Sequence, residues 1–234
     1  MLKCYSIEVL PCYRAIVRIM RTIALITQKG GAGKTTLAAS LAVAATEAGE
    51  TVVALDLDPQ GSLSAWGDDR SADTPTVDRV DGEHLARLPE ILAGLDRQGF
   101  TLVFLDCPGI ASTATNLAMK AADLCLVPAR PTRLDIRATK PTVEALMSLK
   151  RGFAFVLNQC PPNVRSSRAS EAAAGLHMMG VLAEPMIAIR ADYQDAVAVG
   201  QGVTEYAPQG KAADEIRQLW GWIKKHVEIR GARQ

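Results

Sequence analysis

The chain of 234 residues has few aromatic side chains, few histidines and almost no net charge. Phe, Trp and Tyr make up 5% of it against 48% hydrophobic residues in all, so its core must be aliphatic and rich in alanine. Such a core is expected of buried parallel strands covered by helices. The formal net charge of +1 excludes a protein-wide positive field, so any contact with nucleic acid would need a local patch.

Cysteines are too few and too scattered for a metal or disulfide framework. Cys4, Cys12, Cys107, Cys125 and Cys160 include no C-x-x-C pair, and three histidines offer little to complete a metal site. Their odd number indicates reduced thiols in a cytosolic protein. The last three fall within or beside apolar runs, where a small apolar residue is expected. No apolar run is long enough to span a bilayer.

Residues 1–19 are mildly apolar and basic, a composition that a targeting peptide would also have. Pro11 interrupts the segment, and no small-residue cleavage site follows it. Met20 stands immediately before the first predicted strand, so we interpret 1–19 as an upstream extension of the kind that an earlier start codon would add. We expect it to be disordered or peripheral, with residues 20–234 forming a single domain.

One glycine-rich stretch organises the rest of the chain. Residues 28–36 read QKGGAGKTT and lie between an apolar run, 22–27, and a long alanine-rich segment. The order is therefore strand, glycine turn, helix. Glycines let a phosphate chain approach the backbone, and the first N–H groups of a helix supply donors and a favourable dipole. The predicted phosphate-binding residues are Gly30, Gly31, Ala32, Gly33, Lys34, Thr35 and Thr36.

Two lysines distinguish this loop. Lys34 can reach the terminal phosphates as a point charge, and the Thr35 hydroxyl can bind a Mg²⁺ ion that neutralises them. The common pattern G-x-x-x-x-G-K-[ST] would place glycine at position 28, where this chain has Gln28. A second lysine, Lys29, directly precedes the glycine pair.

This form, K-G-G-x-G-K-T-T, resembles the deviant Walker A motif of the ParA/MinD family of ATPases. The resemblance implies ATP and Mg²⁺ as cofactors, and slow hydrolysis that DNA and a partner protein stimulate. It also implies a homodimer with ATP, in which Lys29 reaches the nucleotide of the other subunit and joins Lys34 in catalysis. In a lone subunit Lys29 would be an unpaired cation beside its own loop, so ATP should promote dimerisation.

Apolar strands alternate with helical segments after the loop. Strands are expected over 51–58, 100–106, 124–127 and 153–158, with a minor strand near 76–80 and a short edge element over 186–189. Helices are expected over 34–48, 83–96, 132–150, 163–176 and 209–229, with a polar stretch over 190–208. This alternation indicates an α/β fold with a doubly wound, mostly parallel sheet and helices on both faces.

Three carboxylates end strands that should neighbour the loop, where open α/β sheets bind their ligands. Asp106 closes an apolar strand in the manner of a Walker B acid and should hold Mg²⁺ through water, opposite Thr35. Asp58, in the run D-L-D-P-Q-G-S, matches the family's switch I motif, whose second aspartate orients the attacking water. Asp56 is predicted to support the metal shell or Lys34.

Weaker resemblances concern the second switch and the base. Gly109, in D-C-P-G, stands where a switch II backbone senses the γ-phosphate and moves on hydrolysis. Asn158 resembles the family's adenine-reading asparagine, and the plain alternative is an asparagine in a strand-to-loop turn. Pro128 and Pro131 lie where the family loops over the base, and they would also serve as turn residues.

The resemblance runs from Met20 to about Val227 and favours the small ParA-type partition ATPases. It implies a cytoplasmic, nucleoid-associated protein that binds DNA non-specifically and positions plasmid, chromosomal or other cargo. A ParB-like or other adaptor would stimulate hydrolysis. Non-specific DNA contact needs only cations that face phosphates. The candidates are Arg190, Lys211, Arg217, Lys224 and Lys225.

Two alternatives remain open. The segment 215–229 has one apolar helical face followed by lysines, which a MinD-like membrane-binding helix would share. The same face suits packing on a sheet, which we expect because no flexible linker precedes the segment. A relative of the nitrogenase iron protein would need two cysteines that bridge a cluster, and Cys107 lies too close to Asp106 for that spacing. A cobyrinate amidase would need a further glutamine-hydrolysing domain, for which the chain leaves no room.

Overall fold

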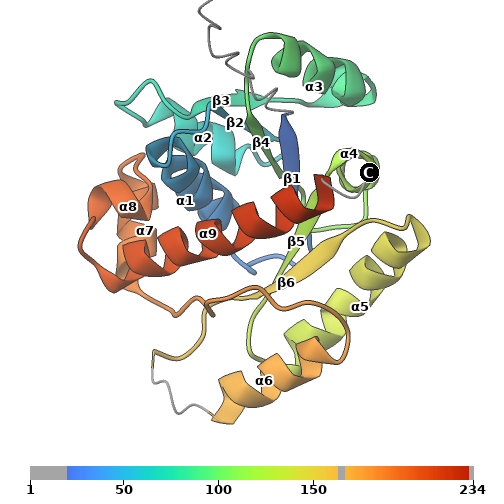
Figure 1. The fold of residues 1–234 in the computed structure, drawn as a ribbon, viewed down its shortest axis with the longest axis vertical. Helices are drawn as coiled ribbons and strands as arrows, with labels where there is room; N and C mark the ends of the chain where they lie inside the picture. Colours follow the sequence, from blue (N-terminus) through green and yellow to red (C-terminus); the bar gives the residue numbers. More distant parts are fainter. Residues whose placement is uncertain (1–19, 163–166, 232–234) are drawn as a thin grey trace, which may run out of the picture.

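The computed structural model describes residues 20–162 and 167–231 (Figure 1). The extension predicted over 1–19 lies outside the described residues, as do Cys4, Cys12 and the first residues of the helix predicted over 163–176. Within the two described ranges, every helix is either too short or too polar to cross a bilayer.

Six parallel strands form one sheet in the order β3-β2-β4-β1-β5-β6. They are β1 (Arg21–Leu25), β2 (Val52–Asp56), β3 (Thr76–Arg79), β4 (Leu102–Asp106), β5 (Leu124–Ala129) and β6 (Phe153–Leu157). The strands β2, β4 and β5 are buried along their whole length, because helices cover both of their faces. The predicted doubly wound α/β fold is confirmed, and the minor strand predicted near 76–80 is β3 at one edge of the sheet.

Helices cover both faces of the sheet (Figure 1). One face carries α1 (Lys34–Glu47), α2 (Ser62–Asp68), α7 (Ala191–Ala198), α8 (Val203–Tyr206) and α9 (Lys211–Gly231). The other carries the 3-10 helix η1 (Gly82–Arg87), α3 (Leu88–Arg97), α4 (Thr113–Ala121), α5 (Arg133–Ser148) and α6 (Ser167–His177). Successive strand residues alternate between the two cores, Ile23 and Leu25 of β1 in the first and Ala24 in the second.

The region 186–208 differs from its prediction. The stretch 190–208 contains the short helices α7 and α8, although it was expected to be a polar connection. Each buries few side chains, so neither has an apolar period long enough to recognise. The edge element predicted over 186–189 is reduced to one bridge, between Ala188 and Cys160.

Two helices before β5 also differ from the prediction. The helix expected over 83–96 is divided into η1 and α3, since Pro89 occupies the first turn of α3, where an N–H has no helical partner. The helix α4 had not been predicted at all. Its local signal is Ser112, whose side chain caps the helix by accepting a hydrogen bond from the Thr115 N–H at 3.1 Å.

The terminal helix α9 packs its apolar face on the sheet, as predicted. Ile216, Leu219 and Ile223 are fully buried in the same core as α1, and each such side chain contributes roughly 1.5–3 kcal/mol. Trp220 stands edge-on to Phe104 of β4, with ring centroids 6.4 Å apart. The face that a membrane-binding helix would need is therefore used inside the fold.

The carboxyl ends of β1, β2 and β4 meet at one edge of the sheet. Asp56 pairs with Asp106 across β2 and β4, and Leu25 pairs with Asp106 across β1 and β4. The glycine loop that follows β1 consequently lies beside both carboxylates, at the edge where open α/β sheets bind ligands.

Candidate functional site

The glycine loop between β1 and α1 borders a cavity of about 730 Å³, within the range of cavities that hold small ligands. Gly31 and Gly33 have φ angles of 75° and 86°, a backbone region that glycine adopts without strain. A Cβ atom added to Gly30 or Gly31 would meet no atom within 4 Å, so these positions face open space. Ala32 is instead buried, at 3% exposure. Other residues of the cavity wall are Lys34, Thr35, Thr36, Asp58 and Gly109.

Thr35 and Asp106 meet at the start of α1. The Thr35 hydroxyl donates to Oδ2 of Asp106 at 2.6 Å, while Oδ1 of Asp106 is buried and has no hydrogen-bond partner. Burial raises the pKa of Asp106 to about 7, the hydrogen bond from Thr35 opposes the rise, and the nearby charge of Asp56 adds to it. A hydroxyl and a carboxylate with a free buried oxygen fit a hard divalent cation such as Mg²⁺.

Asp56 is fully buried and holds the turn that follows β2. Its Oδ1 accepts the N–H of Asp58 at 2.9 Å, and its Oδ2 accepts the N–H and the hydroxyl of Ser64 at 2.9 and 3.2 Å. These bonds make Asp56 a support for the Asp58 turn. Its role in the metal shell stays a prediction.

Asp58 and Gly109 lie on the cavity wall, as their predicted roles require. Oδ1 of Asp58 accepts the N–H of Gln60 at 3.0 Å, which closes a tight local turn. A Cβ atom on Gly109 would lie 3.2 Å from the backbone nitrogen of Gly30, so the loop after β4 touches the phosphate loop directly. The orientation of water by Asp58 and the sensing of the γ-phosphate by Gly109 stay predictions.

Lys29 is paired within the chain, so the prediction of an unpaired cation was wrong. Its Nζ lies 2.6 Å from Oδ1 of Asp135 at the start of α5. Arg130 and the Thr132 hydroxyl contact the same carboxylate. Burial opposes ionisation of Asp135, but the hydrogen bonds from Lys29, Thr132 and Arg130 outweigh it and lower the pKa. Lys29 is therefore held by an anion of its own chain before any ligand binds.

Asn158 and Gln159 brace the phosphate loop from the end of β6. Nδ2 of Asn158, which is 6% exposed, donates to the carbonyl of Ala32 at 2.8 Å, and its Oδ1 accepts the N–H of Gln159 at 2.9 Å. Nε2 of Gln159 donates to the carbonyl of Gly31 at 3.1 Å. Gln159 was not predicted, because its only local signal was its place after Asn158. Adenine reading by Asn158 stays a prediction.

Pro128 lies inside β5 and not in a loop. It is buried and pairs with Val156 of β6. Pro131 follows the strand and is buried as well. Pro128 is therefore part of a strand and not of the loop that was predicted to cover the base. The end of β5 does lie beside Asn158.

Arg190, predicted to contact DNA, is half-buried and paired with Glu215 of α9. Its Nη2 lies 2.5 Å from Oε1 of Glu215, and its Nε donates to the same oxygen at 3.1 Å. The hydroxyl of Tyr193 and the N–H of Ala188 donate to the other carboxylate oxygen. The ion pair of Arg190 thus connects α9 with the segment that precedes α7.

Two further cations of the predicted DNA-binding set also have carboxylate partners. Nη1 of Arg217 lies 3.5 Å from Asp214, and Nζ of Lys224 lies 3.6 Å from Glu50. The Arg217 pair is exposed and therefore weak, whereas Glu50 is only 9% exposed; both pairs reduce the local positive potential. The remaining members, Lys211 and Lys225, are exposed at the start and in the second half of α9.

The described cysteines are core residues outside any disulfide, as predicted. Cys107, Cys125 and Cys160 are all buried. Burial raises the pKa of Cys160 to about 11 and also raises that of Cys107. Both are therefore protonated at neutral pH, as expected of buried cysteines in a core.

Comparison with known sequences identifies one family. The model described as CbiA, the CobQ/CobB/MinD/ParA nucleotide binding domain, matches residues 23–201. The maintenance of carboxysome distribution protein A of Halothiobacillus neapolitanus is 32% identical over 208 residues, which cover 85% of this chain and 94% of that protein. The chromosome-partitioning ATPase Soj of Thermus thermophilus is 25% identical, with 89% and 97% covered.

Solved structures share the fold. Apo McdA from Cyanthece gives a TM-score of 0.74 at 18% identity, with 89% of this chain and 99% of that chain covered. The septum site-determining protein MinD of Pyrococcus horikoshii, complexed with Mg-ADP, gives 0.70 at 21% identity, with 90% and 98% covered. On the matched family model and the glycine loop together, the chain belongs to the CobQ/CobB/MinD/ParA family of nucleotide-binding proteins.

Proposed function

We propose that this protein is an ATPase that binds ATP with Mg²⁺ at residues 28–36, dimerises around the nucleotide and positions a cargo in the cell. The observation that carries the proposal is the free buried oxygen of Asp106 beside the Thr35 hydroxyl, under a glycine loop that faces open space. Relatives named for carboxysome distribution and for chromosome partitioning support the role in positioning.

Phosphate binding would use the start of α1. The helix is 14 residues long, and its unpaired N–H groups supply donors and a favourable dipole toward the loop. Lys34 is 8% exposed, so its charge acts in a poorly solvated place. Thr35 and Asp106 would hold Mg²⁺, which when bound neutralises charge on the phosphate oxygens.

Hydrolysis would depend on where Asp58 is held. Phosphoryl transfer leaves the protein little covalent work, so positioning and charge neutralisation decide the rate. The three hydrogen bonds that Asp56 accepts fix the Asp58 turn before any ligand arrives. This arrangement would let the Asp58 carboxylate orient a water molecule without reorganisation during the reaction.

Dimerisation would exchange one anion for another at Lys29. In a single chain the partner of Lys29 is the Asp135 carboxylate. A triphosphate on a second copy carries more negative charge, so it can compete for the same Nζ. The exchange would link self-association to the presence of ATP, and hydrolysis would return Lys29 to Asp135.

Sedimentation of the purified chain tests this step. A non-hydrolysable ATP analogue with Mg²⁺ should give a dimer, and ADP should give a monomer. The variant Lys29→Ala should bind the analogue and stay monomeric. ATP-dependent dimerisation of this variant at wild-type strength would contradict the proposal.

Association with DNA and with an adaptor belongs to the same proposal. Cytoplasmic, nucleoid-associated positioning through a ParB-like or other adaptor is typical of the ParA-type proteins that the chain resembles. Among the predicted DNA-binding cations, Lys211 and Lys225 are exposed, so they are the best candidates for contact with DNA. Membrane association through α9 is not favoured, because Ile216, Leu219 and Ile223 are fully buried.

ATP hydrolysis is the direct test of the whole proposal. The purified chain should release phosphate from ATP with Mg²⁺, faster with DNA and the adaptor than without them. Chelation of Mg²⁺ should abolish the release. If the chain neither binds nor hydrolyses ATP, the proposed function is wrong.

A further inference from the structure

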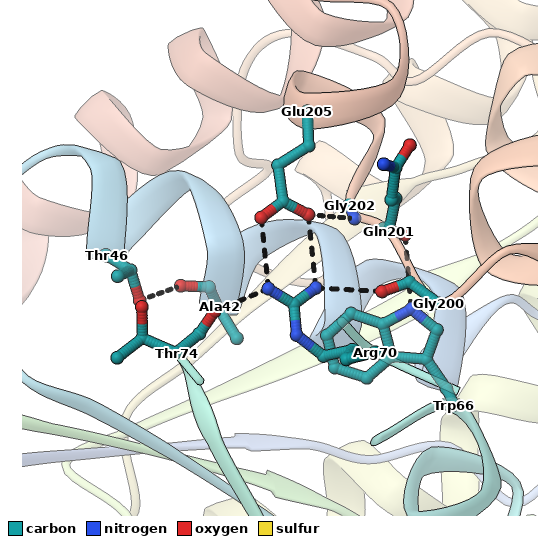
Figure 2. Close-up of polar contacts among 9 residues, drawn as sticks. All are labelled: Ala42, Thr46, Trp66, Arg70, Thr74, Gly200, Gln201, Gly202 and Glu205. Carbon is teal, nitrogen blue, oxygen red and sulfur yellow. Dashed lines mark hydrogen bonds and ion pairs between the residues drawn. The ribbon is translucent and has the colours of Figure 1, made fainter. Parts of the chain in front are cut away.

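A buried polar network outside the nucleotide cavity centres on Arg70, just after α2 (Figure 2). The Arg70 side chain is 3% exposed, and its guanidinium binds both oxygens of Glu205, at 3.1 and 3.0 Å. It also donates to the carbonyl of Gly200 at 3.0 Å and to the carbonyl of Thr74. The Trp66 ring lies against it, 4.8 Å from the guanidinium carbon to the ring centroid.

The network joins α2 to the turn between α7 and α8. Nε1 of Trp66 donates to the carbonyl of Gln201 at 3.1 Å, and Glu205 also accepts the N–H of Gly202 at 2.8 Å. Gly200 has a φ of 67°, and a Cβ atom there would lie 2.3 Å from the carbonyl oxygen of Asp69. The backbone of the turn therefore rests directly on the end of α2.

The opposite end of α2 is fixed below the nucleotide cavity. Ser64, in its first turn, donates twice to Asp56, which also accepts the N–H of Asp58. Asp58 and Val197 of α7 both line the cavity. Hydrogen bonds thus run without a break from the Asp58 turn through α2 to the segment 191–206.

We propose that Arg70 is a positioning residue that couples the Asp58 turn to the segment 191–206, so that ATP orders both together. Separating Arg70 from Glu205 would leave a buried charge without its partner, whereas moving the joined elements together keeps the contacts within the network. Val199 and Tyr206, which are 54% and 42% exposed, would then change position with the nucleotide. The coupling rests on the proposed binding of ATP at residues 28–36.

Hydrogen exchange of the full chain tests the coupling without any variant. Exchange is measured without nucleotide and with Mg²⁺ and a non-hydrolysable ATP analogue, in the segments 29–36, 57–66 and 191–206. The coupling predicts added protection in all three. Protection of 29–36 and 57–66 without change in 191–206 overturns the coupling and leaves ATP binding intact. No change in 29–36 overturns the proposed function, and the coupling with it.

Variants of the ion pair separate coupling from a purely structural role. Glu205→Gln keeps the shape of the side chain and removes its charge, and the control Glu90→Gln makes the same change in an exposed pair with Arg87. In Glu205→Gln the nucleotide-dependent protection of 191–206 should fall about tenfold, with the protection of 29–36 within about twofold of wild type. Coupling as strong in Glu205→Gln as in Glu90→Gln overturns the proposal.

A second substitution covers the case in which Glu205→Gln does not fold. Arg70→Lys keeps the positive charge, but an ammonium group cannot donate to both oxygens of Glu205 in a fixed fork. It should lower kcat for ATP hydrolysis and leave KM within about twofold, as expected when positioning and not binding is lost. Unchanged kcat together with wild-type protection of 191–206 would rule out a positioning role for Arg70.

Discussion

The cavity proposed to bind the nucleotide and the basic side chains near α9 are both polar, but they differ in what their polar groups already bind. Beside the cavity, next to Thr35, Oδ1 of Asp106 is buried without a donor, and Gly30 on the cavity wall faces open space. Near α9, the predicted DNA-binding cations Arg190, Arg217 and Lys224 each lie within 4.0 Å of a carboxylate. A polar group without an internal partner indicates a ligand site more strongly than a paired one, because the paired group gains less from binding.

Lys29 combines features of both groups. It has an internal partner in Asp135, yet it belongs to the strongest motif of the chain. The side chain of Lys29 is 31% exposed, and Arg130 and Thr132 would still contact the buried Asp135 carboxylate if Lys29 left it, so the pair can open. The same contact that satisfies Lys29 in a single chain can therefore be exchanged for a phosphate.

Loss of Lys34 should have the largest effect, because it tests whether the cavity binds the phosphates of ATP. Lys34→Ala removes the poorly solvated cation at the start of α1, so ATP hydrolysis should fall by about 10³-fold. The rate of phosphate release from ATP measures this loss. Lys140→Ala on α5, whose side chain is 75% exposed, serves as the control. Activity of Lys34→Ala comparable to that of Lys140→Ala would show that the cavity is not the site.

Loss of Asp58 should separate binding from hydrolysis within the cavity. Asp58→Ala keeps the phosphate loop, so binding of ATP should persist while the rate of hydrolysis falls about 100-fold. Binding titration and single-turnover hydrolysis measure the two effects, with the exposed Asp73→Ala as the control. Normal hydrolysis in Asp58→Ala would assign the orientation of water to another group.

Release of Lys29 from Asp135 should favour the dimer. Asp135→Asn removes the internal anion, and since a partly exposed ion pair is worth up to about 1 kcal/mol, ATP-dependent dimerisation should tighten about fivefold. Sedimentation at several protein concentrations measures this. Glu144→Gln, on the exposed side of α5, is the matched loss of charge. Weaker dimerisation in Asp135→Asn would mean that Asp135 helps to hold Lys29 in the dimer.

The smallest effect is expected for loss of the exposed lysines of α9, which should weaken binding to DNA. The double variant Lys211→Ala, Lys225→Ala should lower the slope of log affinity for DNA against log salt by about 2, and it should weaken binding on any sequence. Arg217→Gln, which removes a cation already paired with Asp214, should change the slope less. DNA retention measured over a salt series compares them. A larger loss in Arg217→Gln would show that pairing does not decide which cations contact DNA.

Much of the cavity could be predicted from the sequence, because its parts are local. Residues 30–36 carry the turn and the helix start in one stretch, and α1 begins at Lys34 where that stretch predicts it. Asp56 and Asp106 end apolar strands, and parallel strands bring their carboxyl ends to one edge. The short helices α7 and α8 were not predicted, since few buried residues give them little periodicity, and α4 was missed although its buried residues recur at helical spacing.

The sequence by itself determined the parallel sheet, the phosphate loop and the carboxylates beside it, because glycine turns, apolar strands and strand ends are short-range patterns. Only the tertiary structure decided which charges are paired: Lys29 with Asp135, Arg190 with Glu215, and Arg70 with Glu205. Each pair joins elements far apart in the chain. A charge meets its partner only after the helices have packed on the sheet, and that packing is set by the apolar cores on both faces.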